Sequence, residues 1–542
     1  MTDAPPQSTD GSSATSQPSL RKDGASRRPP FTRLLVANRG EIAVRIFRAC
    51  REMGIETVAV YSDADATAGH VRAADRAVRL GAAPAAESYL RGDAIVAAAL
   101  DAGAEGIHPG YGFLAERASF AAAVEAAGLT FIGPASTTIA ALGDKLAARR
   151  SATGAGVPVV PGTLEPAPLD RPDQVDAVVA SAESIGFPLL VKAAAGGGGR
   201  GMRRVADAVA LPAALVAAAA EARAAFGDGA VYLEREIRPA RHIEVQLLGD
   251  RAGAVVAIGE RDCSLQRRHQ KLVEEAPAPG LTRDERRNLH EMAVRVAQAA
   301  GLENAATAEF LLDEDLRFWF LEVNTRLQVE HGVTELVGDL DLVREQILIA
   351  AGEPLSEAAR HAAARASEPV RHAIEVRLSA EDPARDFAPV PGLIRDWRMP
   401  SGPGVRVDTA AEAGDRVPPE YDPLVAKILV VDADRDRAID RLARALAETE
   451  VSGIQTTLPF HRQMALDPAF RAGPFPIDWV DEHWAEALRP GRDAALEAAR
   501  WAAAAAFANL SSPPPTSTGR AADGSTPWVR DGRHGAIDRW PR

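Results

Sequence analysis

Residues 322–331, Glu-Val-Asn-Thr-Arg-Leu-Gln-Val-Glu-His, place a charged or amide side chain at every second position as far as Glu330. Alternate side chains of an extended strand point to one face, so this segment predicts a row of carboxylates, amides and a guanidinium. Carboxylate and amide oxygens suit a hard divalent cation, and a guanidinium suits an oxyanion. The apolar run 318–321 leads into the row, as in a buried strand whose end enters an active site. The alternative is an edge strand with a solvated face.

Lysine is rare in this chain, which makes each lysine informative. Among 62 Lys and Arg residues, five are lysines: Lys22, Lys145, Lys192, Lys271 and Lys427. Because arginine is used almost wherever a positive charge suffices, a remaining lysine is a candidate for a site that needs a compact ammonium group. Lys22 lies in a polar tail, whereas the other four lie in apolar or glycine-rich surroundings.

A run of four glycines, Gly196–Gly199, follows an apolar segment that ends at Lys192. Consecutive glycines expose backbone N–H groups and let the chain approach a polyphosphate closely. The spacing fits neither the P-loop pattern nor the dinucleotide-binding glycine pattern. We interpret the run as a flexible lid over phosphates with Lys192 beside it, and a plain flexible linker is the alternative.

Glu309 lies in the apolar run 307–312, shortly before the polar row. If the two runs form adjacent strands, Glu309 and Glu322 come together as oxygen ligands for Mg²⁺ or Mn²⁺. Phosphoryl transfer needs such cations together with lysines that neutralise the developing charge. The two runs therefore predict a metal-assisted phosphoryl-transfer site.

The segment 261–271 is densely basic, which could indicate binding to RNA or to a small anion. It has no interleaved aromatic residue on which bases could stack, and the net charge of the chain is −13. Binding of an anionic substrate is the better interpretation, and a solvated basic loop is the alternative. Taken alone, His242 and His269 could equally be structural histidines.

The length of 542 residues predicts roughly two to four domains. No apolar run approaches the roughly 18 residues needed to cross a bilayer, and the N-terminus has no apolar core of a signal peptide. We therefore expect no membrane association. Cys50 and Cys263 are the only cysteines and form no CxxC pair, which fits a reducing cytoplasm without disulfides or cysteine-bound zinc.

The order of apolar runs predicts the fold class, which is α/β and α+β. From residue 33 to 134, strand-like and helix-like segments alternate, which is typical of a parallel, Rossmann-like sheet with crossover helices. Short β-like runs return from residue 370 to about 475. Residues 1–30 are rich in Ser, Thr, Pro and charge, which indicates a disordered tail.

The motifs together resemble the biotin carboxylase subunit or domain of biotin-dependent carboxylases, a branch of the ATP-grasp family. The resemblance extends over about residues 33–475. The matching stretches are Ala37–Glu41, His108–Leu114, Gly143–Lys145, the Lys192 glycine loop, Glu260–Pro279, Glu322–His331, Arg377–Asp382, Gly404–Asp408 and Tyr421–Pro423.

The resemblance implies a domain order and a site. The expected parts are a tail (1–30), an N-terminal biotin carboxylase domain (31–144), an ATP-grasp domain (145–352) with a mobile lid at about 160–236, a β-rich C-terminal biotin carboxylase domain (366–475), and an Ala-rich helix with a mobile tail (485–542). The implied nucleotide site consists of Lys145, Lys192, Gly198, Gly199, Glu234, Arg235, Glu236, Ile237, His242 and His269. The implied metal ligands are Glu309, Glu322 and Asn324.

The implied bicarbonate and carboxyphosphate site consists of Lys271, Arg326, Gln328 and the Val329 backbone, with Glu330 as the base and Arg377 as the residue that stabilises the biotin enolate. The implied reagents are ATP, two Mg²⁺ or Mn²⁺ ions, bicarbonate, and biotin on another molecule. The implied partners are a biotin carboxyl carrier protein or domain and a carboxyltransferase subunit, within a homodimer or a larger complex. The implied role is the first half-reaction of an acetyl- or propionyl-CoA type carboxylase.

Three positions depart from the family pattern: Gly332 replaces Pro, Arg371 replaces Gly and Thr457 replaces Asn. None is a catalytic position, and we expect Gly332 to loosen the loop beside Glu330. Two other functions stay open at this point, namely another ATP-grasp carboxylate ligase and a non-catalytic nucleotide-binding module. The bicarbonate-site residues argue against the first, and the presence of Lys271, Glu309 and Glu330 argues against the second.

Overall fold

The computed structural model of the protein describes residues 29–167, 172–194 and 202–484. The chain divides into two compact units, Met1–Glu482 and His483–Arg542, and every helix and strand given below belongs to the first.

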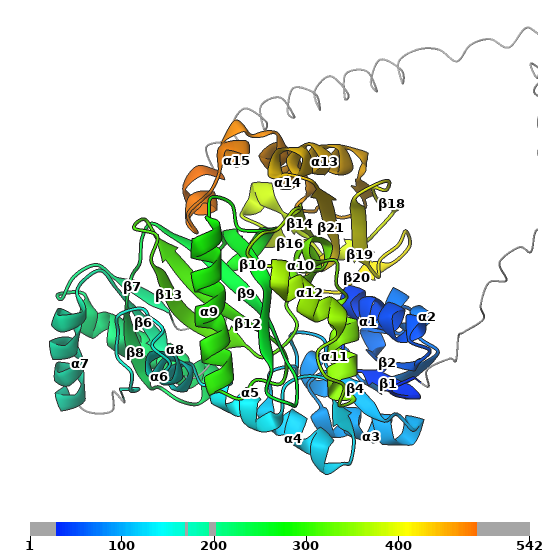
Figure 1. Ribbon diagram of the computed structural model, residues 1–542, viewed down its shortest axis with the longest axis horizontal. Coiled ribbons are helices and arrows are strands. Elements are labelled where there is room, and N and C mark those ends of the chain that lie inside the picture. The colour runs from blue at the N-terminus through cyan, green and yellow to red at the C-terminus, as the bar shows by residue number, and fades with distance from the viewer. Residues whose placement is uncertain (1–28, 168–171, 195–201, 485–542) are drawn as a thin grey trace, which may run out of the picture. The chain divides into compact units, whose positions relative to one another are not determined.

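A five-stranded parallel sheet forms the N-terminal part of the first unit, as the alternating pattern predicted (Figure 1). Its strands are β1 (Arg33–Val36), β2 (Glu56–Ser62), β3 (Arg76–Gly81), β4 (Gly106–His108) and β5 (Thr130–Phe131), in the order β3-β2-β1-β4-β5. The helices of this part are α1 (Gly40–Glu52), α2 (Gly69–Ala73), α3 (Gly92–Ala102), α4 (Ala118–Ala126), α5 (Ser136–Gly143) and α6 (Lys145–Gly154). Gly54, at φ +74°, follows α1 in the left-handed conformation that suits glycine.

An antiparallel sheet of eight strands is the largest element of the fold. Its strands, in spatial order, are β13 (Phe318–Asn324), β12 (Asn304–Asp313), β9 (Ala240–Gly249), β10 (Val255–Arg267), β11 (Gln270–Ala276), β14 (His372–Ser379), β21 (Leu424–Asp432) and β19 (Val405–Thr409). β14 pairs with β11, so the long strands of the β-rich C-terminal part extend the sheet that carries the polar row.

A smaller antiparallel sheet lies in the region of the expected lid. It consists of β6 (Leu189–Ala193), β7 (Arg203–Val205) and β8 (Val231–Arg235), with α7 (Pro172–Ile185) and α8 (Leu211–Phe226) beside it. The glycine run, including Gly198 and Gly199, lies outside the described residues.

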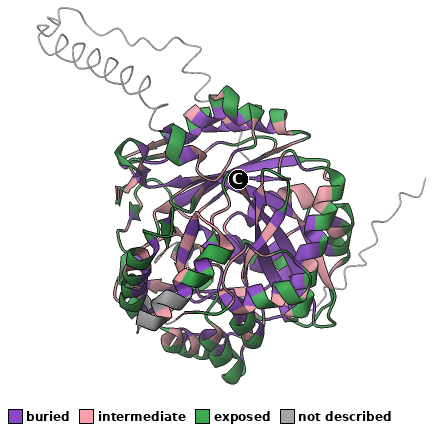
Figure 2. Ribbon diagram, turned by 90° about the vertical axis from the view of Figure 1, so that its left-hand side faces the viewer, coloured by how far each residue is buried: buried purple, intermediate pink, exposed green. Residues whose placement is uncertain are grey.

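Helices pack on the large sheet and shield it from solvent. They are α9 (Arg283–Ala299), α10 (His331–Gly338), α11 (Leu342–Ala350), α12 (Glu357–Arg365) and α13 (Arg435–Glu448). α14 (Leu458–Leu466) packs against α13, and α15 (Pro468–Ala472) packs against α14. The remaining short strands are β15 (Glu381–Asp382), β16 (Ala388–Pro389), β17 (Gly392–Leu393), β18 (Asp396–Arg398), β20 (Arg416–Val417) and β22 (Glu450–Ser452). Figure 2 shows the strands mostly buried and the outer faces of the helices exposed. Among the described residues, no helix is long and apolar enough to span a membrane.

A candidate active site at the end of the polar strand

Glu309 and Glu322 are directly opposite each other on the antiparallel strands β12 and β13, which confirms that adjacent strands bring these two residues together. The Asn324 amide donates a hydrogen bond of 2.8 Å to Glu309. The Glu322 carboxylate lies 2.6 Å from the ammonium group of Lys145. Three hard-oxygen side chains therefore gather where β13 ends, next to one of the retained lysines.

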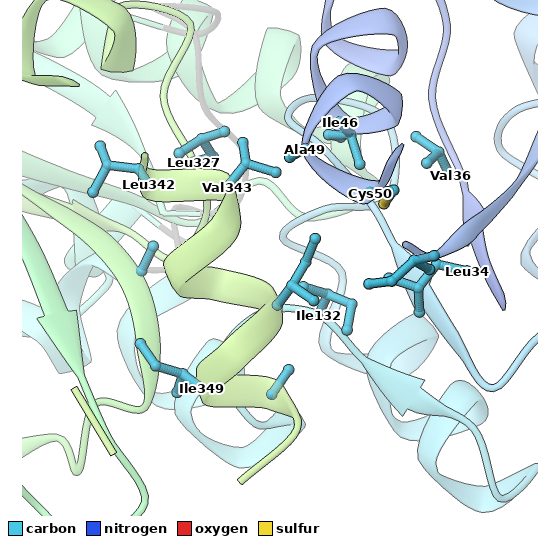
Figure 3. Packing of buried hydrophobic residues seen from close by; sticks show 14 of the residues in the cluster. Leu34, Val36, Ile46, Ala49, Cys50, Ile132, Leu327, Leu342, Val343 and Ile349 are labelled. Atoms are coloured by element: carbon cyan, nitrogen blue, oxygen red, sulfur yellow. The ribbon is translucent and has the colours of Figure 1, made fainter. Parts of the chain in front are cut away.

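The polar row is a strand only as far as Asn324, so the expectation of one continuous strand to Glu330 is wrong. β13 is the outermost strand of the sheet and pairs only with β12 within it, so the chain can turn away without breaking a second ladder. The backbone N–H of Thr325 donates to Glu116 instead, at 3.0 Å. Leu327 is drawn into a hydrophobic cluster with residues of α1 and α11, including Ile46 and Val343 (Figure 3).

Because Leu327 is buried, its two polar neighbours, Arg326 and Gln328, stay near the end of β13 and near Glu309 on β12. The Arg326 guanidinium donates to Gln328 at 2.6 Å, to Asn324 at 3.2 Å and to Glu116 at 3.0 Å. The Gln328 amide donates to Glu309 at 3.3 Å. Tertiary packing therefore brings these polar side chains together although they do not share one strand face.

Lys271 is the centre of the buried charges. Its ammonium group lies 2.6 Å from Glu244, 2.6 Å from Glu330 and 3.4 Å from Glu309. Burial acts to lower the pKa of Lys271, but the surrounding thiol and carboxylates outweigh burial and hold this pKa well above its usual value. Lys271 therefore carries a fixed positive charge in the site.

Glu330 lies between two cations and is fully buried. Its carboxylate accepts from Lys271 at 2.6 Å and from Arg377 at 2.9 Å. Burial acts to raise the pKa of Glu330, but Lys271, Arg377 and Arg261 outweigh burial and hold this pKa well below its usual range. The group is therefore ionised, which a proton acceptor requires.

Arg377 is held at both its side chain and its backbone. The guanidinium donates to Glu274 at 2.6 Å as well as to Glu330. The Arg377 carbonyl oxygen accepts from the Thr457 hydroxyl and from the His461 ring, each at 2.8 Å. Thr457, one of the departures from the family pattern, therefore fixes the backbone of a site residue.

The expected nucleotide residues lie around a second set of ion pairs. Lys192 pairs with Glu234, which also accepts from Arg149 at 2.6 Å. His242 lies 3.2 Å from Glu309 and therefore belongs with the carboxylates around Lys271.

The other expected nucleotide residues that the structure describes lie near these ion pairs but do not take part in them. Glu236 pairs with Arg204 at 2.7 Å, and His269 is exposed at the β10–β11 turn. Among the described residues, the side chains of Arg235, Ile237 and His269 make no hydrogen bond or ion pair with either cluster.

The donor set fits a divalent cation and a polyphosphate. Glu309 and Glu322 offer carboxylate oxygens from adjacent strands, and Asn324 adds an amide oxygen. Lys145, Lys192 and Lys271 are each paired with a carboxylate of the site. These pairs hold three ammonium groups where they can contact phosphate oxygens. The arrangement can bind a metal–nucleotide complex beside a buried base.

Sequence reasoning missed three residues that orient the site, namely Glu116, Glu244 and Glu274. Each accepts a short hydrogen bond from a predicted site cation: Arg326, Lys271 and Arg377, respectively. Only pairing across strands or between distant segments brings them there. Glu244, two residues after His242, and Glu274, three residues after Lys271, were the available signals.

Comparison with known families covers most of the described chain. The family described as "Biotin carboxylase, N-terminal domain" matches residues 30–139, and "Biotin carboxylase C-terminal domain" matches residues 375–482. Between them, "Carbamoyl-phosphate synthase L chain, ATP binding domain" matches residues 144–358. The biotin carboxylase of Pseudomonas aeruginosa is 47% identical over 450 residues, which are 83% of this chain and 98% of that protein. The chain belongs to the biotin carboxylase family.

Other biotin carboxylase relatives agree in sequence and in structure. A pyruvate carboxylase subunit of Methanothermobacter thermautotrophicus is 46% identical over 84% of this chain and 90% of that protein. A solved biotin carboxylase from Campylobacter jejuni superposes with a TM-score of 0.79 at 42% identity, covering 84% of this chain and 99% of that chain. The chain is therefore an ATP-dependent ligase of the biotin carboxylase class, and the resemblance found in the sequence is confirmed.

Proposed function

We propose that this chain carboxylates biotin carried by a separate protein, as the first half-reaction of an acyl-CoA carboxylase. The observation that carries the proposal is the geometry of Glu330, a fully buried, ionised carboxylate held between Lys271 and Arg377. A buried base between two cations suits a substrate that is an anion and must lose a proton, as bicarbonate must.

The proposed reaction begins at the bicarbonate ion. Glu330 takes the bicarbonate proton, and the freed oxygen attacks the γ-phosphorus of ATP, which releases ADP and forms carboxyphosphate. Lys271 contacts Glu330, and Arg326 contacts Gln328, two residues before Glu330. Both cations can therefore hold the oxygens of bicarbonate and carboxyphosphate. Carboxyphosphate then separates into CO₂ and phosphate. The released phosphate takes the proton of the biotin ureido nitrogen, and Arg377 stabilises the biotin enolate that results. The ureido nitrogen then attacks CO₂ and forms carboxybiotin.

The nucleotide is proposed to lie beside Lys145 and Lys192, with Glu309, Glu322 and Asn324 holding Mg²⁺ or Mn²⁺. A bound cation would supply charge that neutralises the phosphate oxygens. In support, a 2-oxoglutarate carboxylase domain of Hydrogenobacter thermophilus, at 44% identity and a TM-score of 0.79, was solved as a dimer with MgADP, ADP and bicarbonate; the match covers 84% of this chain and 98% of that chain. A homodimer is part of the proposal for this chain.

We propose an acyl-CoA as the acceptor of the carboxyl group. Relatives include an acyl-coenzyme A carboxylase alpha3 subunit of Mycobacterium leprae, 46% identical over 85% of this chain and 76% of that protein, as well as pyruvate and 2-oxoglutarate carboxylases. An acetyl- or propionyl-CoA acceptor, reached through a carboxyltransferase partner, and a cytoplasmic location stay predictions.

The deciding experiment measures ATP hydrolysis by the purified chain with Mg²⁺, with and without bicarbonate and free biotin. We expect hydrolysis that requires bicarbonate and rises with biotin, together with transfer of labelled bicarbonate to a biotinylated carrier. Hydrolysis that requires another carboxylic acid would indicate a different carboxylate ligase. Nucleotide binding without hydrolysis would indicate a binding module.

A further inference from the structure

Lys427 is the one lysine in an apolar context for which the proposed reaction has no role. It lies in β21, has 0% of its surface exposed, and is directly opposite Arg377 on β14 and Asp408 on β19. Burying an ammonium group costs several kcal/mol unless partners compensate it. Its retention in an arginine-rich chain therefore calls for a specific contact that a compact ammonium makes.

The groups that compensate the charge of Lys427 differ from the group that accepts its shortest hydrogen bond. Three carboxylates act on the charge at longer range: Glu375, Glu41 at 3.4 Å and Asp408 at 3.8 Å. The shortest contact is to a neutral group, the backbone carbonyl oxygen of Val329, at 2.6 Å. The ammonium group is therefore directed at the peptide that joins Val329 to the proposed base, Glu330.

The preceding peptide is held in the same way. The Gln328 carbonyl oxygen accepts from the His331 ring at 2.8 Å and from the His331 backbone N–H at 3.3 Å. Burial, with Lys427 and Arg45 beside the ring, holds the pKa of His331 well below its usual value. The ring is therefore neutral, and Nδ1 carries the hydrogen that it donates.

These two contacts determine the geometry at Val329. A peptide is planar and trans, so fixing a carbonyl oxygen also fixes the N–H of the same peptide, which points the opposite way. Holding the Gln328 carbonyl fixes the Val329 N–H, and holding the Val329 carbonyl fixes the start of Glu330. The amide and the base are thereby oriented by groups outside the substrate site.

We propose that Lys427 is a positioning residue, which holds the Val329–Glu330 peptide so that the Val329 amide and the Glu330 carboxylate meet the same bicarbonate ion. The inference rests on the proposed function. It assigns a role in catalysis to a lysine of the C-terminal part of the chain, and it links β21 to the site through a backbone contact that the sequence does not reveal.

The test compares the Lys427→Met/Glu41→Gln double variant with the wild type. Methionine keeps the length and volume of the side chain but has no donor, and Glu41→Gln removes a carboxylate that would otherwise be left uncompensated. The matched control is Glu275→Gln, which breaks a buried ion pair with His372 and Arg435 on the face of β11 opposite to Glu274. The readouts are the midpoint of urea unfolding, affinity for an ATP analogue, and KM and kcat for bicarbonate-dependent ATP hydrolysis.

We expect the double variant to fold and bind the ATP analogue as the wild type does, while its KM for bicarbonate rises about tenfold or more, as loss of a charged hydrogen bond implies. Hydrogen exchange at residues 328–333 should also quicken. The control should lower the unfolding midpoint and leave this KM unchanged. A folded double variant with wild-type KM and kcat overturns the inference, and so does a control that raises KM equally. A wild type without bicarbonate-dependent hydrolysis overturns the proposed function and this inference with it.

Discussion

At the scale of single residues, the cations of the site form ion pairs with carboxylates of the chain itself. Lys271 contacts Glu244, Glu309 and Glu330, and Arg377 contacts Glu274 and Glu330. The same cations hold the pKa of Glu330 well below its usual range against the effect of burial, which makes it a weak base in this state. Oxyanions that attract Lys271 and Arg377 would raise this pKa and strengthen the base.

Replacing Glu330 by glutamine should separate binding from chemistry. We expect Glu330→Gln to bind ATP almost as the wild type does, but to lower bicarbonate-dependent turnover by about 10²-fold or more, which is the usual contribution of a general base. Stopped assays of phosphate release at saturating ATP measure the turnover. A folded variant with wild-type turnover would remove Glu330 from the mechanism.

At the scale of elements, Gly332 has a role that its position in the sequence does not suggest. It is buried in the first turn of α10, and a Cβ atom there would lie 2.4 Å from a methyl group of Leu429 on β21 and 3.2 Å from Glu375. Gly332 therefore lets α10 approach the sheet closely beside Glu330. It does so in a packed helix rather than in a loose loop.

The substitution Gly332→Pro restores the residue usual in the family and should destabilise this chain. Proline suits the first turn of a helix, but its ring would collide with Leu429, and overpacking of this kind typically costs about 1–3 kcal/mol. Urea unfolding measures the loss. Leu429→Ala should lower the free energy of unfolding less in the Gly332→Pro variant than in the wild type. An equal loss in both would contradict the steric explanation.

Glu275 on β11 connects the neighbouring strand β14 and the helix α13. It contacts His372 on β14 at 2.8 Å and Arg435 on α13 at 2.7 Å. Burial acts to raise the pKa of Glu275, but these two partners outweigh it and lower the pKa to about 2. Because the folded-state value is depressed, the stabilisation is present above the unfolded-state pKa and is lost as pH falls toward 2.

We expect Glu275→Gln to lower the free energy of unfolding by about 3 kcal/mol at pH 7, because the folded-state pKa of about 2 lies well below the usual value of a glutamate. Urea unfolding at a series of pH values measures the effect. The difference between wild type and variant should shrink as pH falls from 5 to 3. A difference that stays constant over this range would show that the pair does not act through its charge.

At the scale of the whole molecule, one sheet joins the metal-ligand strands to the strands of the C-terminal part. Glu309 and Glu322 lie on β12 and β13 at one edge, and Lys427 lies on β21 near the other. Arg377 on β14 bridges the two regions through its contacts with Glu274 and Glu330. The strands of both parts therefore contribute residues to one site.

The same placement of lysines predicts that this chain carries no biotin. A biotin acceptor is a lysine on an exposed turn, whereas Lys145, Lys192 and Lys271 form ion pairs in the site and Lys427 is fully buried. Lys22 lies outside the described residues, in a polar segment. Streptavidin blotting after expression with a biotin ligase should give no signal at the mass of the chain. A signal abolished by one Lys→Arg change would contradict this.

The sequence alone determined the residue types of the site, the family resemblance and several of the strands, including those that carry Glu309 and Glu322. These follow from local patterns: the apolar runs around Glu309 and Glu322 are long and uniform enough to specify strands, and the retained lysines stand out against arginine. Tertiary structure decided where β13 ends, because only the burial of Leu327 between α1 and α11 shows why the chain leaves the sheet after Asn324. It also decided the partners of the cations. Glu116 and Arg326 are 210 residues apart, and Lys427 is 98 residues from the Val329 carbonyl, distances at which no local pattern carries information.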